Sequence, residues 1–372
     1  MKKDIREALQ RAHEQDWSFA SGRILGSMCT MPHPAALDAY REFLETNLGD
    51  ARLFPGTKQL ERAVVARVGE LLHAPASAEG RMTSGGTESN LTALWIHTRL
   101  RDSGRVIVPE HAHFSFKKAA MLMDLELETL PCPGHVADAE ALPGMLDDNV
   151  ACVVAVAGTT SLGLVDPIEE MAACCHDADV PLHVDAAYGG FILPFLRQMN
   201  MDDRLFDFAL DGVSSISLDP HKMGMSVIPS GLLMLRDGDW FEHIAVRATC
   251  THTRRQLSLL GTRPGAAAAA TYAVLNELGW AGYRDVVSRC MDTTRYAALR
   301  LRAAGFTLVS EPELTVLAVR VEEPQHVAAT LADRGWMVGV NERDGAIRLV
   351  MMPHVKKTLI DDFVSDLTTV VS

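Results

Sequence analysis

The sequence predicts an α/β fold in which helices cover a mainly parallel sheet, followed by a small α+β unit. Two observations lead to this prediction. Short runs rich in Val and Ala lack the alternation of a half-exposed strand, so they suit strands that are buried on both faces. These runs lie at 106–108, 152–156, 180–184 and 213–217. Segments with helical periodicity separate them, which is typical of layered α/β proteins.

The helices of the large domain are predicted in chain order. The first 57 residues form a charged, helical N-terminal segment, and the large domain occupies 58–275. Apolar residues from Leu60 to Leu72 recur at three- and four-residue spacing, as on one face of an amphipathic helix. Further helices are expected from the glycine turn at 84–87 to about Leu100, and then at 114–123, 137–147 and 167–178.

The C-terminal part changes pattern and predicts a small α+β domain over 276–372. A long helix is expected at 281–304, with Val287, Met291 and Leu301 on one face. It is followed by a strand, a helix, two strands and a final helix. The four segments before that last helix are expected at 314–321, 325–334, 336–340 and 345–350.

Composition excludes several classes of function. The 372 residues carry 35 Lys and Arg against 48 Asp and Glu, a net charge of −13, which disfavours a nucleic-acid or anionic-membrane surface. No apolar run approaches the ~18–20 residues of a membrane-spanning helix. The beginning, MKKDIREALQRAHEQD, lacks the apolar centre of a signal peptide. Seven Cys without a CxxC pair indicate neither a disulfide framework nor a zinc ribbon, so a cytoplasmic location is expected.

Three motifs carry the candidate functional residues. In HVDAAYGG (183–190), Asp185 ends a buried strand, where α/β proteins place groups that contact ligands. In SLDPHKMG (217–224), Lys222 follows a second apolar strand, and a lysine held in an apolar pocket can form a Schiff base. In TSGGTESN (83–90), a glycine turn opens a helix, whose first N–H groups and positive dipole suit a phosphate.

Each motif alone has an ordinary structural interpretation. Asp185 could cap a turn, Lys222 could be solvated, and Thr87 could be the N-cap of a helix that binds nothing. Other phosphate and nucleophile motifs are absent from the sequence, including G-x-x-x-x-G-K-[ST] and G-x-S-x-G. His111 and His113 could share one face of a strand, but no carboxylate or Cys at ligand spacing accompanies them, so no metal is expected.

In combination, the three motifs match what pyridoxal 5'-phosphate requires. The helix start would bind the phosphate, and the lysine would form the Schiff base. The carboxylate would keep the pyridine nitrogen protonated, so that the ring can accept electrons.

The motifs resemble those of the group II pyridoxal-phosphate-dependent amino-acid decarboxylases, most closely the archaeal L-tyrosine/L-aspartate decarboxylase subfamily. Longer blocks carry the resemblance over nearly the whole chain: ILGSMCTMPHP, FLETNLGDARLFPGTKQLE, FDFALDGVSSISLDPHKMGMSVIPSGLL and LLGTRPGAAAAATYAVL. The resemblance implies the fold type I transferase architecture. This is a mainly parallel seven-stranded sheet sandwiched by helices, with a small C-terminal α+β domain.

The resemblance also implies roles for residues around the cofactor ring. Lys222 matches the Schiff-base lysine, and Asp185 matches the partner of the pyridine nitrogen. Ala187 matches the small residue against one face of the ring. His113 matches the histidine stacked on the other face, where it could also polarise the leaving carboxylate; its alternative is an ordinary loop histidine.

Further positions match the phosphate site of the family. Gly86 and Thr87 match the phosphate turn, with His221 beside it. The segment from Gly261 and Thr262 to residue 265 resembles the glycine turn that completes the phosphate site from the neighbouring subunit. The resemblance therefore implies a homodimer with shared active sites.

Two positions match groups farther from the ring. Thr159, or Thr160 next to it, would lie near the hydroxyl group of the cofactor. Arg348 resembles the C-terminal-domain arginine that holds the α-carboxylate of the substrate, for which a guanidinium fork is suited. The alternative for Arg348 is a surface ion pair at a strand edge.

The chain departs from its relatives at one point. They carry a tyrosine on a mobile loop before the GTRPG turn, which is thought to help protonate the carbon that has lost CO2. The five Tyr here are at 40, 188, 272, 283 and 296, so the loop has none. His252 is the obvious substitute; the alternative is that His252 is a solvated loop residue and that water or Lys222 supplies the proton.

The predicted function is removal of the α-carboxylate of an L-amino acid as CO2. By resemblance, the expected reactions are L-tyrosine to tyramine, as in methanofuran biosynthesis, and L-aspartate to β-alanine, as in coenzyme A biosynthesis. One alternative is a carbon–carbon lyase of the sphingosine-phosphate lyase type, whose second phosphate would require further cationic residues. The other is a catalytically silent scaffold, for which retention of Lys222 and Asp185 has no purpose.

Overall fold

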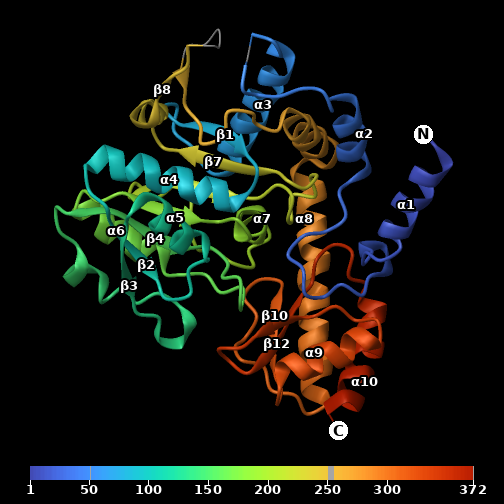
Figure 1. Cartoon of the computed structure of the whole chain (residues 1–372). Coiled ribbons are helices and arrows are strands. Elements are labelled where there is room, and N and C mark those ends of the chain that lie inside the picture. Colours follow the sequence, from blue (N-terminus) through green and yellow to red (C-terminus); the bar gives the residue numbers. More distant parts are fainter. Residues whose placement is uncertain (51, 250–254, 372) are drawn as a thin grey trace. The chain divides into compact units, whose positions relative to one another are not determined.

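The computed structural model describes residues 1–50, 52–249 and 255–371. The chain divides into two compact units, which are described separately (Figure 1). The larger unit comprises Pro32–Arg289 and Pro312–Leu314. The smaller unit comprises Met1–Met31, Cys290–Glu311 and Thr315–Ser372.

A seven-stranded sheet forms the centre of the larger unit. Its strands are β1 (Glu79–Thr83), β2 (Arg105–Pro109), β3 (Glu126–Leu130), β4 (Val150–Val156), β5 (Leu182–Asp185), β6 (Val213–Leu218) and β7 (Gly231–Leu235). Their order is β1-β7-β6-β5-β4-β2-β3. Strand β7 runs antiparallel to both neighbours and the other pairs are parallel, so the predicted mainly parallel seven-stranded sheet is confirmed.

Burial of the strands explains which of them the sequence revealed. All seven residues of β4 and all four of β5 are buried, and both strands were predicted from their apolar runs. The edge strands β1 and β3 were not predicted, because their sequences EGRMT and ELETL are polar and partly exposed. Strand β7, GLLML, is fully buried but contains no β-branched residue, so its sequence does not favour a strand over a helix.

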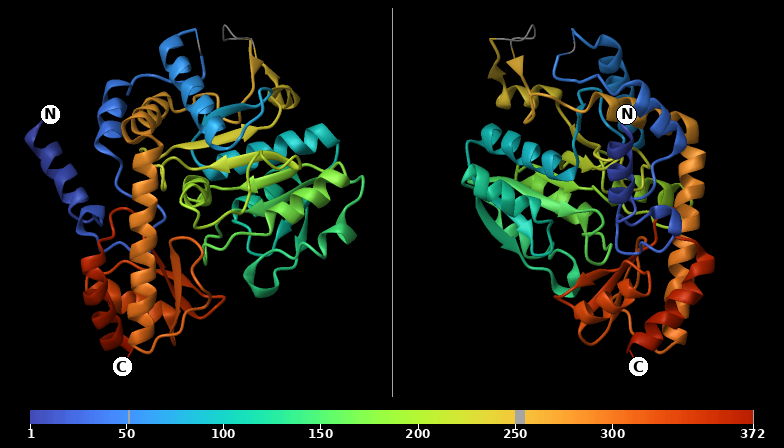
Figure 2. Two further views of the ribbon diagram at one scale, coloured as in Figure 1. Left: turned by 180° about the vertical axis from the view of Figure 1, so that it is seen from behind. Right: turned by 45° about the vertical axis from the view of Figure 1, so that its right-hand side comes forward.

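Helices flank this sheet (Figure 2). The α-helices of the larger unit are α2 (Pro34–Glu42), α3 (Pro55–Leu71), α4 (Gly86–Arg101), α5 (Ser115–Met123), α6 (Ile168–Asp177), α7 (Leu193–Gln198) and most of α8 (Gly265–Ala303). Shorter elements are η2 (Pro133–His135), η3 (Leu142–Met145), η4 (Gly189–Phe191), η5 (Gly238–Ile244), β8 (Val246–Arg247) and β9 (Arg255–Gln256). Helix α4 crosses the sheet and packs against β4, β6 and β7.

The α4 helix contributes to two apolar clusters. Leu94 packs with Val106, Phe116 and Val154, whereas Ile96 packs with Leu233. These contacts fix the helix that begins at the glycine turn against the strands whose ends carry the candidate residues.

Two predicted helices differ from the structure. The stretch 137–147 contains only η3, because Pro143 and Gly144 interrupt the backbone pattern of an α-helix. The helix predicted at 281–304 begins earlier, at Gly265, and its helical geometry is broken at Gly279 (φ 57°, ψ 179°). The apolar run 266–270 therefore belongs to the same helical element.

The smaller unit is an α+β structure. It contains α1 (Lys3–His13), η1 (Phe19–Ser21), β10 (Val316–Arg320), α9 (Pro324–Asp333), β11 (Gly339–Asn341), β12 (Ala346–Val350), η6 (Lys357–Leu359) and α10 (Ile360–Val371). The strands form an antiparallel sheet in the order β10-β12-β11. Its core includes Leu25, Trp336 and Phe363.

The units do not follow the predicted ranges 1–57, 58–275 and 276–372. Residues 1–31 join the smaller unit because the chain near Leu25 pairs with it. Leu25 N–H donates to the carbonyl of Met337 at 2.7 Å, and its own carbonyl accepts from Val350 N–H at 2.6 Å. The separate, dimer-contacting role of 1–57 stays a prediction.

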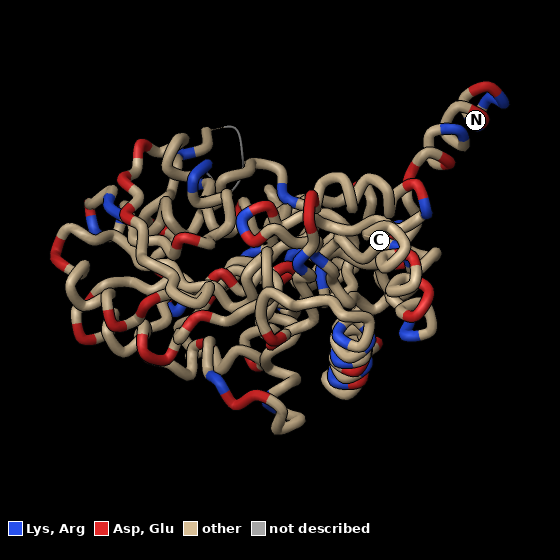
Figure 3. The backbone as a smooth tube through the Cα atoms, turned by 90° about the horizontal axis from the view of Figure 1, so that it is seen from below, with Lys and Arg blue, Asp and Glu red and all other residues tan. Residues whose placement is uncertain are grey.

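Acidic and basic residues are interspersed along the described backbone (Figure 3). None of the helices within the described ranges has the length and apolar character needed to span a membrane.

Candidate active site

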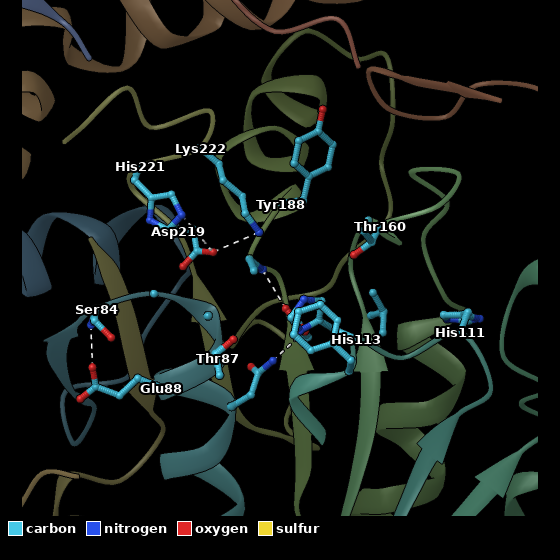
Figure 4. Close-up of a pocket in the computed structure, with 18 residues that line it drawn as sticks. Ser84, Thr87, Glu88, His111, His113, Thr160, Tyr188, Asp219, His221 and Lys222 are labelled. Carbon is cyan, nitrogen blue, oxygen red and sulfur yellow. Dashed lines mark hydrogen bonds and ion pairs between the residues drawn. The ribbon is translucent and has the colours of Figure 1, made fainter. Parts of the chain in front are cut away.

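A cavity of about 310 Å³ lies in the larger unit, at the carboxyl ends of its parallel strands. Its walls are the first turn of α4, the loop after β2, the ends of β4 and β5, and the segment after β6 (Figure 4). The carboxyl edge is the usual ligand side of an open α/β sheet. The structure thus brings the three predicted motifs into one cavity.

Lys222 lies in this cavity next to an acidic partner that the sequence reasoning missed. Its Nζ is 3.0 Å from Oδ2 of Asp219, three residues earlier in the turn after β6. Asp219 is 3% exposed, and its Oδ1 has no hydrogen-bond partner in the described structure. The i,i+3 spacing within the Asp-Pro-His-Lys run is the signal that could have identified this pair.

The glycine turn opens α4 without a side-chain cap. Gly85 is the N-cap, with φ 149°, and no side chain caps the helix, so the alternative of Thr87 as N-cap is wrong. A Cβ built on Gly86 would lie 3.1 Å from both the Ala187 Cβ and the Asp219 Oδ2, a closer approach than most side chains tolerate. The turn therefore presents its backbone directly to the cavity.

His221 lies beside the turn, as predicted. Its Nε2 is 3.8 Å from Oδ2 of Asp219, and its Nδ1 contacts the backbone of Ser230. A Cβ on Gly85 would meet the His221 ring at 3.3 Å. The ring thus closes one side of the glycine turn.

Asp185 is 6% exposed at the end of β5 and is held by hydrogen bonds on both oxygens. Oδ2 accepts from Nδ2 of Asn90 at 2.8 Å, and Oδ1 accepts from Ala187 N–H at 3.1 Å. The hydroxyl of Ser217 lies 3.4 Å from Oδ1. The carboxylate thus does cap a local turn, but it also lines the cavity and is oriented by a neighbouring helix.

His113 and Ala187 both line the cavity. Nδ1 of His113 is 2.9 Å from Oγ of Ser115 and accepts from Ser115 N–H at 3.2 Å. Burial lowers the pKa of His113, which favours the neutral ring. The alternative is an ordinary loop histidine with its hydrogen bonds made locally. Its bonds to Ser115 agree with that alternative, but its position in the cavity wall does not follow from it.

The structure corrects the choice between the two threonines after β4. Thr160 lines the cavity, whereas Thr159 does not. Thr159 is 1% exposed, and its hydroxyl accepts from Leu164 N–H at 3.1 Å, because the chain turns back at this point. Thr160 replaces Thr159 as the candidate.

His111 also lines the cavity and is paired with a buried carboxylate. Its Nε2 is 3.2 Å from Oδ1 of Asp166. Burial lowers the pKa of His111, but hydrogen bonds and charge from Asp166 and Cys132 outweigh burial and raise it to about 9. Across residues 1–50, 52–249 and 255–371, no group of three or more His, Cys, Asp or Glu is placed to hold a metal ion.

The GTRPG segment does not line this cavity. Gly261 and Thr262 are exposed, whereas Arg263 is buried and forms an ion pair with Glu61. Glu61 also accepts Met82 N–H at 3.0 Å and contacts Lys58 Nζ at 2.6 Å. One buried carboxylate thus anchors both strand β1, which leads to the glycine turn, and the segment with Gly261.

Arg348 and His252 are not placed at the cavity by the structure. Arg348 is in the middle of β12, in the smaller unit, where its Nη2 donates to the carbonyl of Gly26 at 2.6 Å. His252 lies outside the described residues.

The residues of the cavity fit pyridoxal 5'-phosphate. The uncapped start of α4 suits a phosphate, and the close packing of Gly86 against Ala187 and Asp219 leaves no room for a side chain at this turn. Lys222 provides an amine, and Asp185 provides a carboxylate held in a fixed direction. The chemistry of this set of groups matches the cofactor.

Comparisons with known proteins agree with this fit. Residues 42–322 match the family model of the pyridoxal-dependent decarboxylase conserved domain. A probable L-tyrosine/L-aspartate decarboxylase from Methanothrix thermoacetophila is 46% identical over 98% of this chain and 94% of that protein. An L-aspartate/L-glutamate decarboxylase from Pyrococcus horikoshii is 38% identical over 100% of this chain and 98% of that protein.

A solved structure shares the architecture. The sphingosine-1-phosphate lyase of Burkholderia pseudomallei superposes with a TM-score of 0.90 at 28% identity, over 100% of this chain and 90% of that one. The fold is thus the fold type I architecture of pyridoxal-phosphate enzymes. The chain belongs to the pyridoxal-dependent decarboxylase family and is a carboxy-lyase that uses pyridoxal 5'-phosphate.

Proposed function

We propose that this enzyme decarboxylates L-tyrosine, L-aspartate or both, using the cavity at the carboxyl edge of the sheet. One observation carries the proposal: Lys222, Asp185 and the glycine turn open on the same cavity although they come from three separate segments. The bound cofactor supplies an electron sink for the carbon that loses CO2. The protein's own residues bind and orient the reacting groups.

Lys222 is the residue proposed to bind the cofactor covalently. The carboxylate of Asp219, 3.0 Å from Nζ, holds the amine in position and can accept its proton, which the amine must lose before it acts as a nucleophile. Both groups sit on the same turn, so their separation depends little on movements elsewhere.

Asp185 is proposed to hold a proton on the ring nitrogen. Donors from Asn90 and Ala187 hold the carboxylate in one direction. Ala187 and His113 are proposed to enclose the two ring faces. Burial lowers the pKa of His113, which favours the neutral ring.

The first turn of α4, with Gly86 and Thr87, is proposed to bind the phosphate, with His221 closing the turn. Thr160 is proposed to lie near the cofactor hydroxyl. Gly261 and Thr262 are proposed to complete the phosphate site of a second subunit, which makes the enzyme a homodimer. Their exposure, and the anchoring of the neighbouring Arg263 to Glu61, support this role.

Two further roles are proposed from the resemblance alone. Arg348 binds the α-carboxylate of the substrate, and His252 supplies the proton that replaces CO2. An activity that depends on a histidine in the loop would titrate near the ordinary pKa of ~6.5.

Names of the relatives support the choice of substrates. The Methanothrix protein is named for L-tyrosine and L-aspartate, and the Pyrococcus protein for L-aspartate and L-glutamate. The products, tyramine and β-alanine, would feed methanofuran and coenzyme A biosynthesis respectively. The similarity to the structure of a sphingosine-1-phosphate lyase supports a second candidate function, which is cleavage of a carbon–carbon bond in a phosphorylated amino alcohol.

The experiment is a substrate panel with the cofactor-loaded enzyme. L-tyrosine, L-aspartate, L-glutamate and sphingosine 1-phosphate are each incubated, and CO2, amine and aldehyde are quantified. CO2 with an equal amount of tyramine or β-alanine is expected. Aldehyde and phosphoethanolamine from the phosphorylated substrate, without CO2 from any amino acid, would instead favour the lyase. Lys222→Ala is the inactive control.

A further inference from the structure

A continuous chain of buried hydrogen bonds runs from the cavity along α4, between this helix and strands β5 and β6. The shared element is Asn90 on α4, which is 1% exposed. Its Nδ2 donates to Oδ2 of Asp185 at 2.8 Å and to Oγ of Ser115 at 3.0 Å. Its Oδ1 lies 2.7 Å from Oγ of Ser217 and 3.0 Å from Nε2 of His183.

The chain continues behind Asn90 through two histidines. Oγ of Ser215 lies 2.8 Å from Nδ1 of His183 and 2.8 Å from Nε2 of His97. His97, His183 and Ser215 are all fully buried. Nδ1 of His97 has no hydrogen-bond partner in the described structure, so the chain ends there.

The ionised Asp185 fixes the direction of every bond in the chain. A carboxylate only accepts, so the Asn90 amide must turn its NH2 group toward Asp185 and its oxygen toward His183. His183 must then carry its proton on Nε2, which leaves Nδ1 to accept from the Ser215 hydroxyl. Ser215 has no second proton, so it accepts from Nε2–H of His97.

The same amide fixes His113. The second N–H of Asn90 donates to Ser115, so the Ser115 hydroxyl donates onward to Nδ1 of His113. The backbone N–H of Ser115 donates to the same ring atom. His113 therefore carries its proton on Nε2 when it is neutral.

Electrostatics support a neutral chain. Burial lowers the pKa of His97 to about 3 and that of His183 to about 4. Titratable groups near Asn90 include Asp185 and His183 on β5, Glu88 and His97 on its own helix, and His113 ahead of α5; the cavity is also lined by Lys222, Asp219, His221 and His111. Near pH 7 the chain behind Asp185 thus contains no competing charge.

We propose that Asn90 is a positioning residue that sets the protonation of both groups facing the cofactor ring, Asp185 directly and His113 through Ser115. The hydrogen bonds through His183, Ser215 and His97 prevent the side-chain amide of Asn90 from rotating by half a turn and exchanging its oxygen and nitrogen. This inference rests on the proposed roles of Asp185 and His113. Donation to the carboxylate stabilises its anion, so Asn90 keeps the shared proton on the ring nitrogen rather than on Asp185.

The test is an NMR measurement on the holoenzyme loaded with pyridoxal phosphate labelled with ¹⁵N at the ring nitrogen. The Asp185→Asn variant gives the resonance expected when the nitrogen is unprotonated. In Asn90→Leu, which has a similar volume but no donors, the resonance should move from the wild-type position toward that of Asp185→Asn. Thr92→Val is the matched control, because Thr92 lies on the same helix and its hydroxyl has no hydrogen-bond partner in the described structure; it should retain the wild-type resonance.

A second measurement uses ¹⁵N-histidine and reads which ring nitrogen carries the proton. Wild-type enzyme should show His113, His183 and His97 protonated on Nε2. Ser115→Ala should mix the two forms of His113 while leaving the cofactor nitrogen unchanged. A proton on Nδ1 of His183 or His113 in wild-type enzyme would overturn the inference.

The outcomes separate this inference from the function on which it rests. If Asp185→Asn does not alter the ring nitrogen, the role proposed for Asp185 is wrong and the inference falls with it. If Asp185→Asn alters it and Asn90→Leu does not, only the inference is wrong. If Asn90→Leu does not fold, Ser215→Ala decides, because it leaves Asp185 and the cavity untouched. A smaller shift in the same direction supports the proposal, and an unchanged resonance overturns it.

Discussion

His111 and His183 are both enclosed by protein, but their pKa values are shifted in opposite directions. His111 faces the carboxylate of Asp166 at 3.2 Å, and its pKa is raised to about 9. His183 faces an amide oxygen and a hydroxyl, and burial lowers its pKa to about 4. The chemical type of the partner, and not the depth of burial, decides whether a histidine beside this cavity is charged.

The contrast extends to two sets of residues at the cavity, a set of ion pairs called the charged wall and a set of neutral groups called the neutral wall. One wall contains ion pairs, Lys222 with Asp219 and His111 with Asp166. The other contains neutral groups that converge on a single charge, Asp185. Ion pairs tolerate changes in proton supply poorly, whereas a neutral network keeps its hydrogen bonds over a wide pH range. The charged wall therefore suits proton exchange, and the neutral wall suits fixed orientation.

The largest effect, on turnover, is expected from removing the carboxylate of Asp185, on which the neutral groups converge. Asp185→Asn should keep the fold and much of the cofactor but lower turnover by about 10²–10⁴-fold, as for one strong electrostatic or acid–base element. The physical reason is that an amide cannot hold a proton on the ring nitrogen. Steady-state kinetics with a saturating amino acid measure the loss. Near-native turnover in a cofactor-loaded variant would rule out the role.

The next effect is acid destabilisation from the neutral wall. The pKa values of His97 and His183 are lower in the folded state than the unfolded value of ~6.5, so the unfolded chain binds these protons first. The contribution of these two histidines to the free energy of unfolding is therefore fully present above pH 6.5, and it is lost as the pH falls toward 4. At pH 5 the expected loss is about 2 kcal/mol for each histidine relative to pH 7.

Urea unfolding at pH 7 and pH 5 measures that loss. His97→Gln should reduce the difference between the two pH values by roughly half, since one of the two histidines is removed. An equal acid loss in wild type and variant would show that His97 is not the neutral group described above.

The charged wall predicts the opposite pH dependence with a smaller size. The pKa of His111 is raised in the folded state, so its contribution is fully present below pH 6.5 and is lost as the pH rises through 9. Between pH 7 and pH 9 the expected decrease in the free energy of unfolding is about 2 kcal/mol. Asp166→Asn should greatly reduce the decrease, because the carboxylate that favours the imidazolium is gone and only Cys132 remains. An undiminished decrease in this variant would assign it to other groups.

The smallest effect is expected from replacing Thr92, which lies outside both walls. The Thr92 hydroxyl is buried on α4 without a hydrogen-bond partner, so it belongs to neither wall. Thr92→Val should leave activity unchanged and raise the free energy of unfolding by up to about 1 kcal/mol. Urea unfolding at pH 7 checks the stability. A loss of activity would show that the hydroxyl contacts a group absent from the interactions described here.

The sequence revealed the parts of the fold that depend on composition. Runs such as 152–156 are apolar on both faces and rich in Val, which favours buried strands, so the strands at the centre of the sheet were predictable. Strand β3 escaped prediction because its pairing with β2, and not its polar sequence, makes it a strand. The stretch 137–147 has helical periodicity, but Pro143 and Gly144 disfavour an α-helix, and only the short η3 forms.

The residues of the candidate site were predictable where a reactive side chain lies within a short, recognisable sequence motif. Lys222, Asp185 and Gly86 each lie within a short recognisable run, and the structure places all three around one cavity. The partners of these residues were not predictable. Asn90 meets Asp185 from 95 positions away in the chain, and His111 meets Asp166 from 55 positions away. Spatial pairs of this kind leave no spacing pattern in a single sequence.

The carboxylate of Glu61 has a consequence for how this protein can vary. It accepts the N–H of Met82 before the glycine turn and binds the guanidinium of Arg263 beside Gly261. Loss of Glu61 alone would leave a cation buried without a counter-charge, which typically costs several kcal/mol. Glu61 and Arg263 are therefore constrained to change together, and the two glycine turns cannot diverge independently. Across homologues, a neutral residue at either position should be accompanied by a neutral residue at the other.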